Sequence, residues 1–406
     1  MRKALLKVHR YVGLVITLFL VIAGLTGCII AFHDELDGYI NQSIFYVPRQ
    51  NQPLLDPLAL RDRLLVDYPD ANIEYVELET RHGKAIKIYL DPKKTDRGYT
   101  TLPNDELYAD PYTGKIIGAR LWGDIGQGWT NLLPFIYRLH YSLALKGVGI
   151  LLFGLIALLW TLDCFVAVYL TFPARQKSHS RHELTQRISH WGRRWHKAWK
   201  IRWFAGFHKL NFDIHRAGGL WLWAVLFVFA WSSVGFNLQQ VYSPVMRTMF
   251  AFNDAESHLQ KMGSPLELPG ISWIEARSYG RQFARQAEQQ YGFKVLHEAT
   301  INYDQRHGIY RYIVKTSDDQ HIKQGRTRFY IDAQTGALKH LETPRLDKAG
   351  DIATNWLQWI HMARVFGLPM KIFVILIGLS VTILSLTGLF IWYKKRHARK
   401  AGNRFL

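Results

Sequence analysis

Cysteine is scarce in this chain of 406 residues, and the only two, Cys28 and Cys164, fall inside long apolar runs. Neither is placed to staple an exported domain, and no Cys-x-x-Cys-His segment could attach a haem covalently. The chain also lacks His-Glu-x-x-His and any Gly-x-Gly-x-x-Gly after a strand. These absences exclude a disulfide framework, a common zinc pattern and a dinucleotide site of its own.

Acidic residues are scarce in three basic segments. Residues 1–10 hold four Lys/Arg and no acid, residues 172–216 hold eleven against two acids, and residues 393–406 hold six against none. That sum of 21 basic and 2 acidic residues is the whole net charge of +19, and the remaining chain is neutral. With apolar runs between the segments, this is the positive-inside pattern of a membrane protein, not a nucleic-acid surface.

Four apolar runs supply the spans, at about 11–32, 147–172, 217–236 and 369–393. Each has about the 20 residues that a helix needs to cross the hydrocarbon layer. Because the basic segments flank these runs, both termini are predicted to be cytoplasmic, with 34–146 and 237–368 on the other side of the membrane. The predicted division is helix 1 (1–33), exported segment 1 (34–146), helix 2 (147–172), a basic loop (173–213), helix 3 (214–236), exported segment 2 (237–368), helix 4 (369–393) and a basic tail (394–406).

The first run has an alternative interpretation as a lipoprotein signal peptide, because Leu25-Thr26-Gly27-Cys28 resembles a cleavage box. Its opening motif recurs in the third run, which lies in mid-chain and cannot be a signal. We therefore expect the first span to be retained.

The sequence repeats itself at a spacing of 206 to 224 residues. His-Arg-x-x-Gly-Leu occurs at 9–14 and 215–220, and Tyr-x-Asp-x-x-Thr-Gly occurs at 108–114 and 330–336. Two units of span, exported segment and span would share one orientation, related by a pseudo-two-fold axis along the membrane normal. The fold class predicted is an integral membrane protein with four transmembrane helices in two pseudo-symmetric units.

The exported segments are predicted to be α+β. Alternating apolar residues at 86–90 and 310–314 favour strands, and residues 56–67 and 274–291 favour helices. The Asp-x-x-Thr-Gly pieces are typical of turns, in which Asp bonds the backbone and Gly supplies positive φ.

Tryptophans recur every four residues in the basic loop, interleaved with cations. This spacing predicts a helix lying in the cytoplasmic interface, in contact with lipid phosphates. A nucleic-acid surface is the alternative that we do not favour so close to two spans. The tryptophans are Trp191, Trp195, Trp199 and Trp203.

Four of the 17 histidines recur at equivalent places in the repeat. His9 and His215 lie at the cytoplasmic edge, and His140 and His361 at the outer edge. Across an axial pseudo-dyad, two neutral imidazoles can face one another and bind a haem iron from opposite sides. Zinc would need two further ligands. Spacing alone leaves purely structural histidines as an equal alternative.

His33 lies 24 residues after His9, about 36 Å along a helix, which implies haem sites at two depths. His33 could replace an outer ligand or act in the second shell; a helix-end polar cluster is the alternative. Arg10 and Arg216 could hold haem propionates or serve as anchors. Asp163 is an acid within a span, for which we expect pairing with Arg10 or Arg216, the alternative being a proton relay.

These motifs resemble the PepSY-associated transmembrane family, together with Leu-His-x-Ser-Leu at 139–143 and Ile-His-x₅-Gly-Leu-Pro at 360–369. The chain is similar, more closely, to the FoxB-type ferrisiderophore reductases of that family. One departure is Leu386-Thr387-Gly388-Leu389 in the fourth span, where the second has Leu162-Asp163-Cys164-Phe165.

The resemblance implies two b-type haems on His9, His215, His140 and His361, without establishing which histidines pair. It implies an oxidoreductase that reduces siderophore-bound iron(III) in the periplasm, with a membrane quinol or cytoplasmic reductase as donor. The alternatives are a non-redox protein that binds or regulates a periplasmic partner, and a proton or metal permease using His140, His361 and Asp163.

Overall fold

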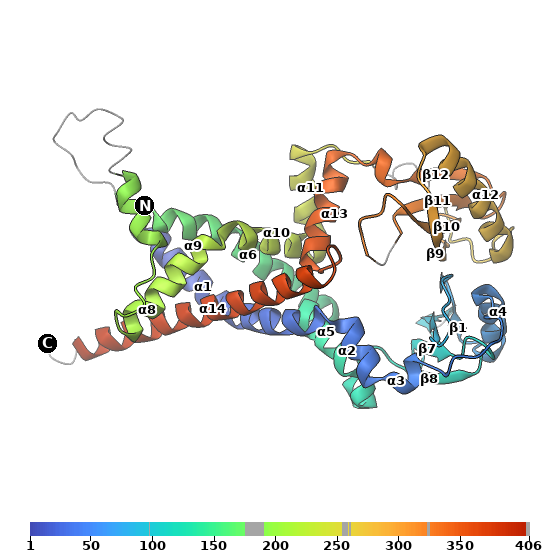
Figure 1. Ribbon diagram of the computed structural model, residues 1–406, viewed down its shortest axis with the longest axis horizontal. Coiled ribbons are helices and arrows are strands. Elements are labelled where there is room, and N and C mark those ends of the chain that lie inside the picture. The colour runs from blue at the N-terminus through green and yellow to red at the C-terminus, as the bar shows by residue number, and fades with distance from the viewer. Residues whose placement is uncertain (97, 175–190, 254–258, 260, 323–324, 403–406) are drawn as a thin grey trace.

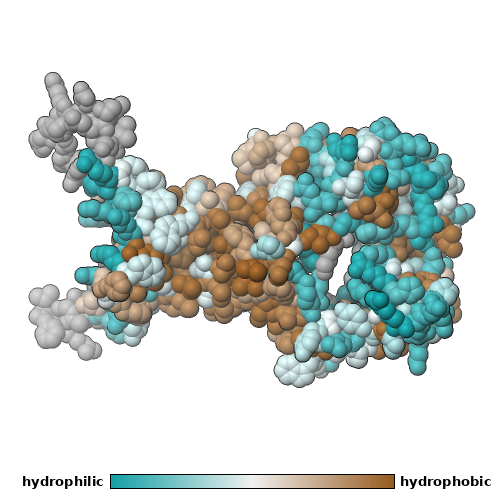
Figure 2. Space-filling view, in the orientation of Figure 1, coloured by the Kyte–Doolittle hydropathy of each residue, from teal (hydrophilic) through white to brown (hydrophobic). Residues whose placement is uncertain are grey.

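A computed structural model describes the chain except residues 97, 175–190, 254–258, 260, 323–324 and 403–406. The molecule is elongated, with a helical bundle at one end of its long axis and a β-sheet domain, here called the head, at the other (Figure 1). Both termini lie at the end of the bundle remote from the head. Apolar residues cover the middle of the bundle, whereas the head and the opposite tip are hydrophilic (Figure 2).

Three helices of the bundle are long and apolar enough to cross a membrane. They are α1 (Arg2–Ile30), α6 (Lys146–Thr171) and α14 (Leu368–Gly402). Helix α1 packs along both α14 and α6. Their positions match the predicted first, second and fourth spans.

The third span differs from the single helix expected over 214–236. It consists of α8 (Phe207–Asp213), a π-helical turn η4 (Ile214–Gly218), α9 (Gly219–Trp221) and α10 (Trp223–Asn237), with a bend of 70° before Trp223. The helix is interrupted at Leu222, whose φ of −97° and ψ of 1° depart from α-helical values, three residues after Gly218-Gly219. Helix α10 alone is only about 22 Å long, which is too short to cross the hydrocarbon layer. The segments on both sides of the bend, Phe207–Trp221 and Trp223–Asn237, therefore together form the candidate third span.

The predicted tryptophan helix is shorter than expected. Residues 191–196 are helical and η3 (Lys197–Trp199) continues as a 3₁₀ turn, but the chain then turns away before Trp203. The ring of Trp195 is tilted against that of Trp191 and meets that of Trp199 edge to face, with ring centres 5.3 Å apart in both pairs. The preceding part of the predicted basic loop, 175–190, lies outside the described residues.

The head is one antiparallel sheet of eight strands, in the order β12-β11-β10-β9-β2-β3-β7-β8. The segment 34–146 contributes β2 (Tyr75–Glu77), β3 (Ile86–Tyr89), β7 (Glu106–Ala109) and β8 (Ile116–Arg120). The segment 237–368 contributes β9 (Val295–Asp304), β10 (Ile309–Thr316), β11 (Thr327–Asp332) and β12 (Leu338–Glu342). Pairing of β2 with β9 joins them, so the two segments that were predicted separately form a single sheet.

Helices cover the sheet face that is turned away from the bundle (Figure 1). Helix α4 (Pro57–Asp67) and helix α12 (Trp273–Tyr291) pack there on a common apolar core that includes Leu64 and Ile301. Short pieces complete the first segment: α3 (Gln42–Phe45), β1 (Ala71–Asn72), β4 (Asp91–Pro92), β5 (Lys94–Thr95), β6 (Gly98–Tyr99), η1 (Ile125–Gln127) and η2 (Trp129–Asn131). The sheet face that α4 and α12 do not cover is turned toward the bundle.

The turn predicted for the repeated Asp-x-x-Thr-Gly pieces is confirmed. Asp110 accepts hydrogen bonds from the backbone N–H groups two and three residues on, and Asp332 does the same. The glycines that follow, Gly114 and Gly336, have φ of 71° and 75°, a conformation that favours glycine.

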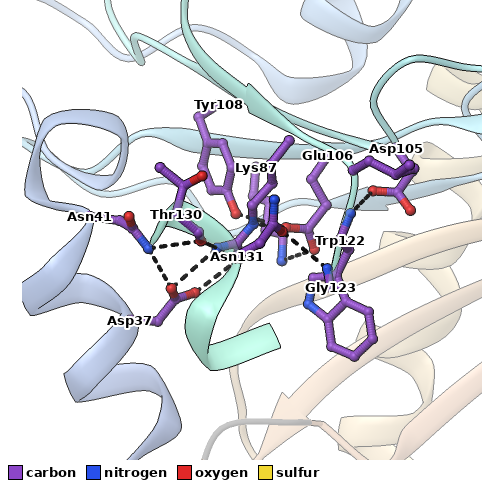
Figure 3. A network of polar contacts seen from close by, with 12 residues as sticks. Asp37, Asn41, Lys87, Asp105, Glu106, Tyr108, Trp122, Gly123, Thr130 and Asn131 are labelled. Carbon is purple, nitrogen blue, oxygen red and sulfur yellow. Dashed lines mark hydrogen bonds and ion pairs between the residues drawn. The ribbon is translucent and has the colours of Figure 1, made fainter. Parts of the chain in front are cut away.

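A buried polar network ties the bundle to the head (Figure 3). Arg120, only 1% exposed, donates to Asp37 on α2 (His33–Ile40) at 2.9 Å and to Glu106 on β7 at 2.8 Å. Burial by itself would raise the pKa of the Glu106 carboxyl, but Lys87 and Arg120 hold that pKa below its usual value. Arg120 also donates to the carbonyl of Thr130, just before α5 (Leu132–Ser142).

Candidate functional site

Two histidines face each other at the end of the bundle that holds the termini. His9 lies on α1 and His215 on the π-turn η4, and their ring centres are 6.1 Å apart. These residues, here called the tail pair, come from positions 206 apart in the chain. π-Turns are frequent at functional sites because they redirect a side chain that a regular helix would place elsewhere.

A second pair of histidines lies at the head end of the bundle. His140 near the end of α5 and His361 at the end of α13 (Ala349–His361) have ring centres 6.4 Å apart. We call these residues the head pair. Both stand on short helices beside the spans, not on the spans themselves. The sequence left the pairing open; in the structure each histidine faces its counterpart in the repeat.

The tail-pair rings are held through their Nδ1 atoms. His9 Nδ1 lies 2.9 and 3.0 Å from the two carboxylate oxygens of Asp163 on α6. His215 Nδ1 lies 3.0 Å from the carbonyl oxygen of Leu384 and 3.1 Å from Thr387 Oγ1, both on α14. A carboxylate and a carbonyl only accept hydrogen bonds, so both rings carry their proton on Nδ1.

The head-pair rings are held in the same way by hydroxyl groups. His140 Nδ1 lies 3.0 Å from Thr26 Oγ1, and His361 Nδ1 lies 2.7 Å from Ser232 Oγ. Each hydroxyl already donates its proton to a backbone carbonyl, that of Ile22 or Phe229, and therefore accepts from the imidazole. All four histidines consequently present Nε2 with a free lone pair, the form in which imidazole binds a metal.

The distances between the rings fit an iron held from two sides. Two opposed imidazoles that each bond one iron at about 2 Å have ring centres about 6 Å apart. Among the described residues, no group of three or more His, Cys, Asp or Glu side chains could hold a metal ion, so the two-histidine pairs do not extend into a zinc-like cluster.

A cavity of about 330 Å³ adjoins the tail pair, within the range of small-molecule sites. His9, His215, Asp163, Arg10 and Arg216 contribute to its wall, which is otherwise mainly apolar. This combination suits a flat apolar ring system with charged edges. At the tail pair, the donor set and the lining of the cavity therefore suit a non-covalent haem.

The two arginines predicted as propionate contacts line this cavity. Arg216 Nη2 donates to the fully buried Asp213 at 2.9 Å, whereas its Nε is buried with no partner among the residues that the structure describes. An anionic group entering the cavity could satisfy that N–H. The expectation that Asp163 pairs with Arg10 or Arg216 is wrong, because Asp163 bonds His9 and Arg216 is held by Asp213.

His33 stands apart from the two facing pairs. Its Nδ1 lies 3.1 Å from Asp34, and its ring packs against Tyr137 with centres 5.5 Å apart. His33 Nε2 is buried with no protein partner, so the ring keeps a free polar atom beside α5. His140 of the head pair contacts Thr26, which lies 17 residues after His9 on α1. The two pairs are therefore separated by about 26 Å along the helix, not by the 36 Å that His33 as a ligand would give.

Sequence reasoning missed the groups that orient the rings, namely Thr26, Ser232, Thr387 and the carbonyl of Leu384. It also missed Asp213, which holds Arg216. A signal for two of them was present, because Thr26 follows His9 by 17 residues and Ser232 follows His215 by the same number. Thr387 occupies the place in the fourth span where the second has Asp163, and both orient a tail-pair histidine. The difference between the fourth and second spans at this place therefore exchanges a carboxylate for a hydroxyl as the hydrogen-bond partner of the histidine.

The fold and the two pairs define a multi-pass membrane protein with opposed imidazoles at both ends of its bundle. The family model described as PepSY-associated TM region matches residues 6–395, and the chain belongs to this family. No curated protein matches the chain.

Proposed function

We propose that this protein is a di-haem reductase of the bacterial inner membrane, similar to the FoxB-type ferrisiderophore reductases. It carries electrons from the cytoplasmic side, where both termini lie, to the periplasmic head. There it reduces siderophore-bound iron(III) to iron(II), which oxygen-donor chelators release for uptake. Two tandem units related by a pseudo-two-fold axis each supply one histidine to each pair.

The observation that carries this proposal is the matched geometry of the two pairs. In both pairs hydrogen-bond partners hold the Nδ1 atoms, which leaves Nε2 free on each ring, and the ring centres lie 6.1 and 6.4 Å apart. A b-type haem held between two imidazoles supplies one-electron transfer between iron(III) and iron(II). A single pair could be structural, but two pairs at separate levels define a path through the bundle.

The residues around the tail pair would bind and orient the cofactor. His9 and His215 would hold the iron, their Nδ1 partners fix the ring tautomer, and Arg10 and Arg216, which line the cavity, would bind the propionates. His140 and His361 hold the second iron, with Thr26 and Ser232 fixing their rings. His33 is a second-shell residue near the head end, where Nε2 could donate to or accept from a propionate through a water molecule.

The electron donor is a membrane quinol or a cytoplasmic reductase. A quinol releases two electrons and two protons, which is enough to reduce two ferric chelates by one electron each. The substrate approaches from the head side, and the lipid bilayer surrounds the spans.

A polar cavity of about 260 Å³ is our candidate for the acceptor site. It lies between α11 (Gln239–Met249), α13 and the β11–β12 edge of the sheet. Thr354 and Asn355 on α13 line it, six or seven residues before His361 and therefore about 10 Å away along the helix. Its wall combines Arg328 and amide and hydroxyl groups with acids, which suits an oxygen-rich chelate of low net charge.

Absorption spectroscopy of the protein purified from haem-replete membranes tests the proposal. We expect a Soret band, sharp α-bands after dithionite reduction and two haems per chain. The reduced protein should then be reoxidised by a ferric hydroxamate, with iron(II) captured by a chromogenic chelator in equal amount to the electrons lost. A colourless protein would overturn the proposal and return attention to a partner-binding protein or a permease.

Single alanine variants of the four histidines assign the sites. Each variant should retain one haem of two, and His9→Ala and His215→Ala should lose the same one. His208→Ala, on α8 in the same bundle, is the matched control and should keep both. Retention of both haems by all four variants would disprove the ligand assignment.

A further inference from the structure

The two histidine pairs differ in the charge of the groups that orient them. Three of the four rings donate their Nδ1–H to neutral oxygens, those of Thr26, Ser232 and the Leu384–Thr387 site. Only His9 donates to a carboxylate, that of Asp163, at 2.9 and 3.0 Å from its two oxygens. The tail pair therefore carries an anionic hydrogen bond for which the head pair has no counterpart.

Asp163 is well placed for this contact to be strong. Its side chain is only 9% exposed and lies on α6 among apolar span residues, where charge–charge interactions are weakly screened. Arg216, a cation of the second unit that lines the same cavity as Asp163, is engaged by Asp213, which in turn binds Arg202. Asp163 thus acts directly on His9, while Arg216 is balanced by another acid.

A carboxylate that accepts from Nδ1–H makes the imidazole a more electron-rich ligand. Such a ligand stabilises the more positive iron(III) form relative to iron(II) and lowers the reduction potential of that site. Hydroxyl partners have a smaller effect because they carry no net charge. The tail site should therefore be the weaker oxidant and the head site the stronger one.

We infer that Asp163 is a positioning residue that lowers the reduction potential of the tail site below that of the head site, so that electrons run downhill toward the head. This inference rests on the proposed function. With haems held by His9 and His215 and by His140 and His361, each electron from a quinol or cytoplasmic reductase would cross from the tail site to the head site and leave on one ferric chelate, so that one donor electron is consumed per iron(II) formed.

A spectroelectrochemical titration of the full-length holoprotein tests the inference. The wild-type protein should titrate in two one-electron steps. In Asp163→Asn the amide oxygen can still accept a hydrogen bond from His9. The midpoint potential of the lower step should nevertheless rise by about 59 mV, which corresponds to a tenfold change in the equilibrium constant for one electron. The upper step should stay in place. Thr387→Val is the matched control, since His215 keeps its bond to Leu384 O, and should move the lower step far less.

The outcomes separate this inference from the proposed function. A haem-free wild-type protein overturns the proposed function, whereas two haems with an unmoved lower step in Asp163→Asn overturn only the role of Asp163. If Asp163→Asn loses a haem, Asp163→Glu restores the carboxylate and should return the low potential. An Asp163→Glu protein that binds two haems but has a raised midpoint potential for the lower step would also contradict the inference.

Discussion

At the residue scale, the four histidines show what a repeat can and cannot predict. Their equivalence identified them in the sequence, because each recurs at the same place relative to a span. Their partners were harder to find, since a serine or threonine within an apolar run is common and its role depends on which helix lies beside it. Asp163 was noticed as an intramembrane acid but assigned to the wrong partner, because charge favours arginine and sequence gives no distance.

Glycine at position 388 makes room for the ring of His215. A Cβ built there would lie 2.9 Å from His215 Cε1, closer than a real contact allows. We expect Gly388→Ala to displace the ring from its bonds to Leu384 and Thr387 and to reduce the haem content from two toward one per chain. Haem-to-protein stoichiometry checks this expectation. Gly147→Ala, where nothing lies within 4 Å of the new Cβ, is the control and should keep both haems.

At the scale of elements, hydropathy located the spans but not their shape. Helices α1, α6 and α14 follow the predicted runs closely, because length and apolarity suffice to define a span. The bend of 70° in the third span lies at Leu222 and depends on local backbone geometry, which hydropathy does not report. The joining of β2 to β9 was likewise unpredictable, since both strands had the expected alternation but nothing in either specifies its neighbour.

The Arg120 network is an element-scale joint whose loss should loosen the head. Replacing Arg120 by Met would leave the buried Asp37 and Glu106 without their shared cation, a change that typically costs about 3–5 kcal/mol of stability. We expect a clearly lower thermal midpoint and faster proteolysis between α2 and α5. Arg345→Met removes an exposed pair with Asp318 and should cost only about 0–1 kcal/mol. Equal effects of the two variants would show that the network does not stabilise the joint.

At the scale of the whole molecule, the sheet joins the two halves of the chain, because β2 of the first half pairs with β9 of the second. Both halves of the chain contribute to the sheet, to the tail pair and to the head pair, so neither half contains a complete site. The sheet face without α4 and α12 is turned to the bundle (Figure 1). Residues of β11, β12, α11 and α13 line the polar cavity. A substrate held there would lie next to the helix that carries His361.

The cavity makes the acceptor step separable from electron transfer within the bundle. Arg328 on β11 lines the cavity and pairs with Glu342 at 3.0 Å. Because one charge-assisted hydrogen bond contributes about 1.5 kcal/mol, we expect Arg328→Gln to raise the KM for a ferric hydroxamate about tenfold. Haem content, spectrum and both midpoint potentials should remain unchanged. Arg345→Gln, in the head but away from the cavity, should keep the wild-type KM. An unchanged KM in Arg328→Gln would place the acceptor elsewhere on the head, whereas a shifted spectrum would mean that the substitution reaches the haem sites.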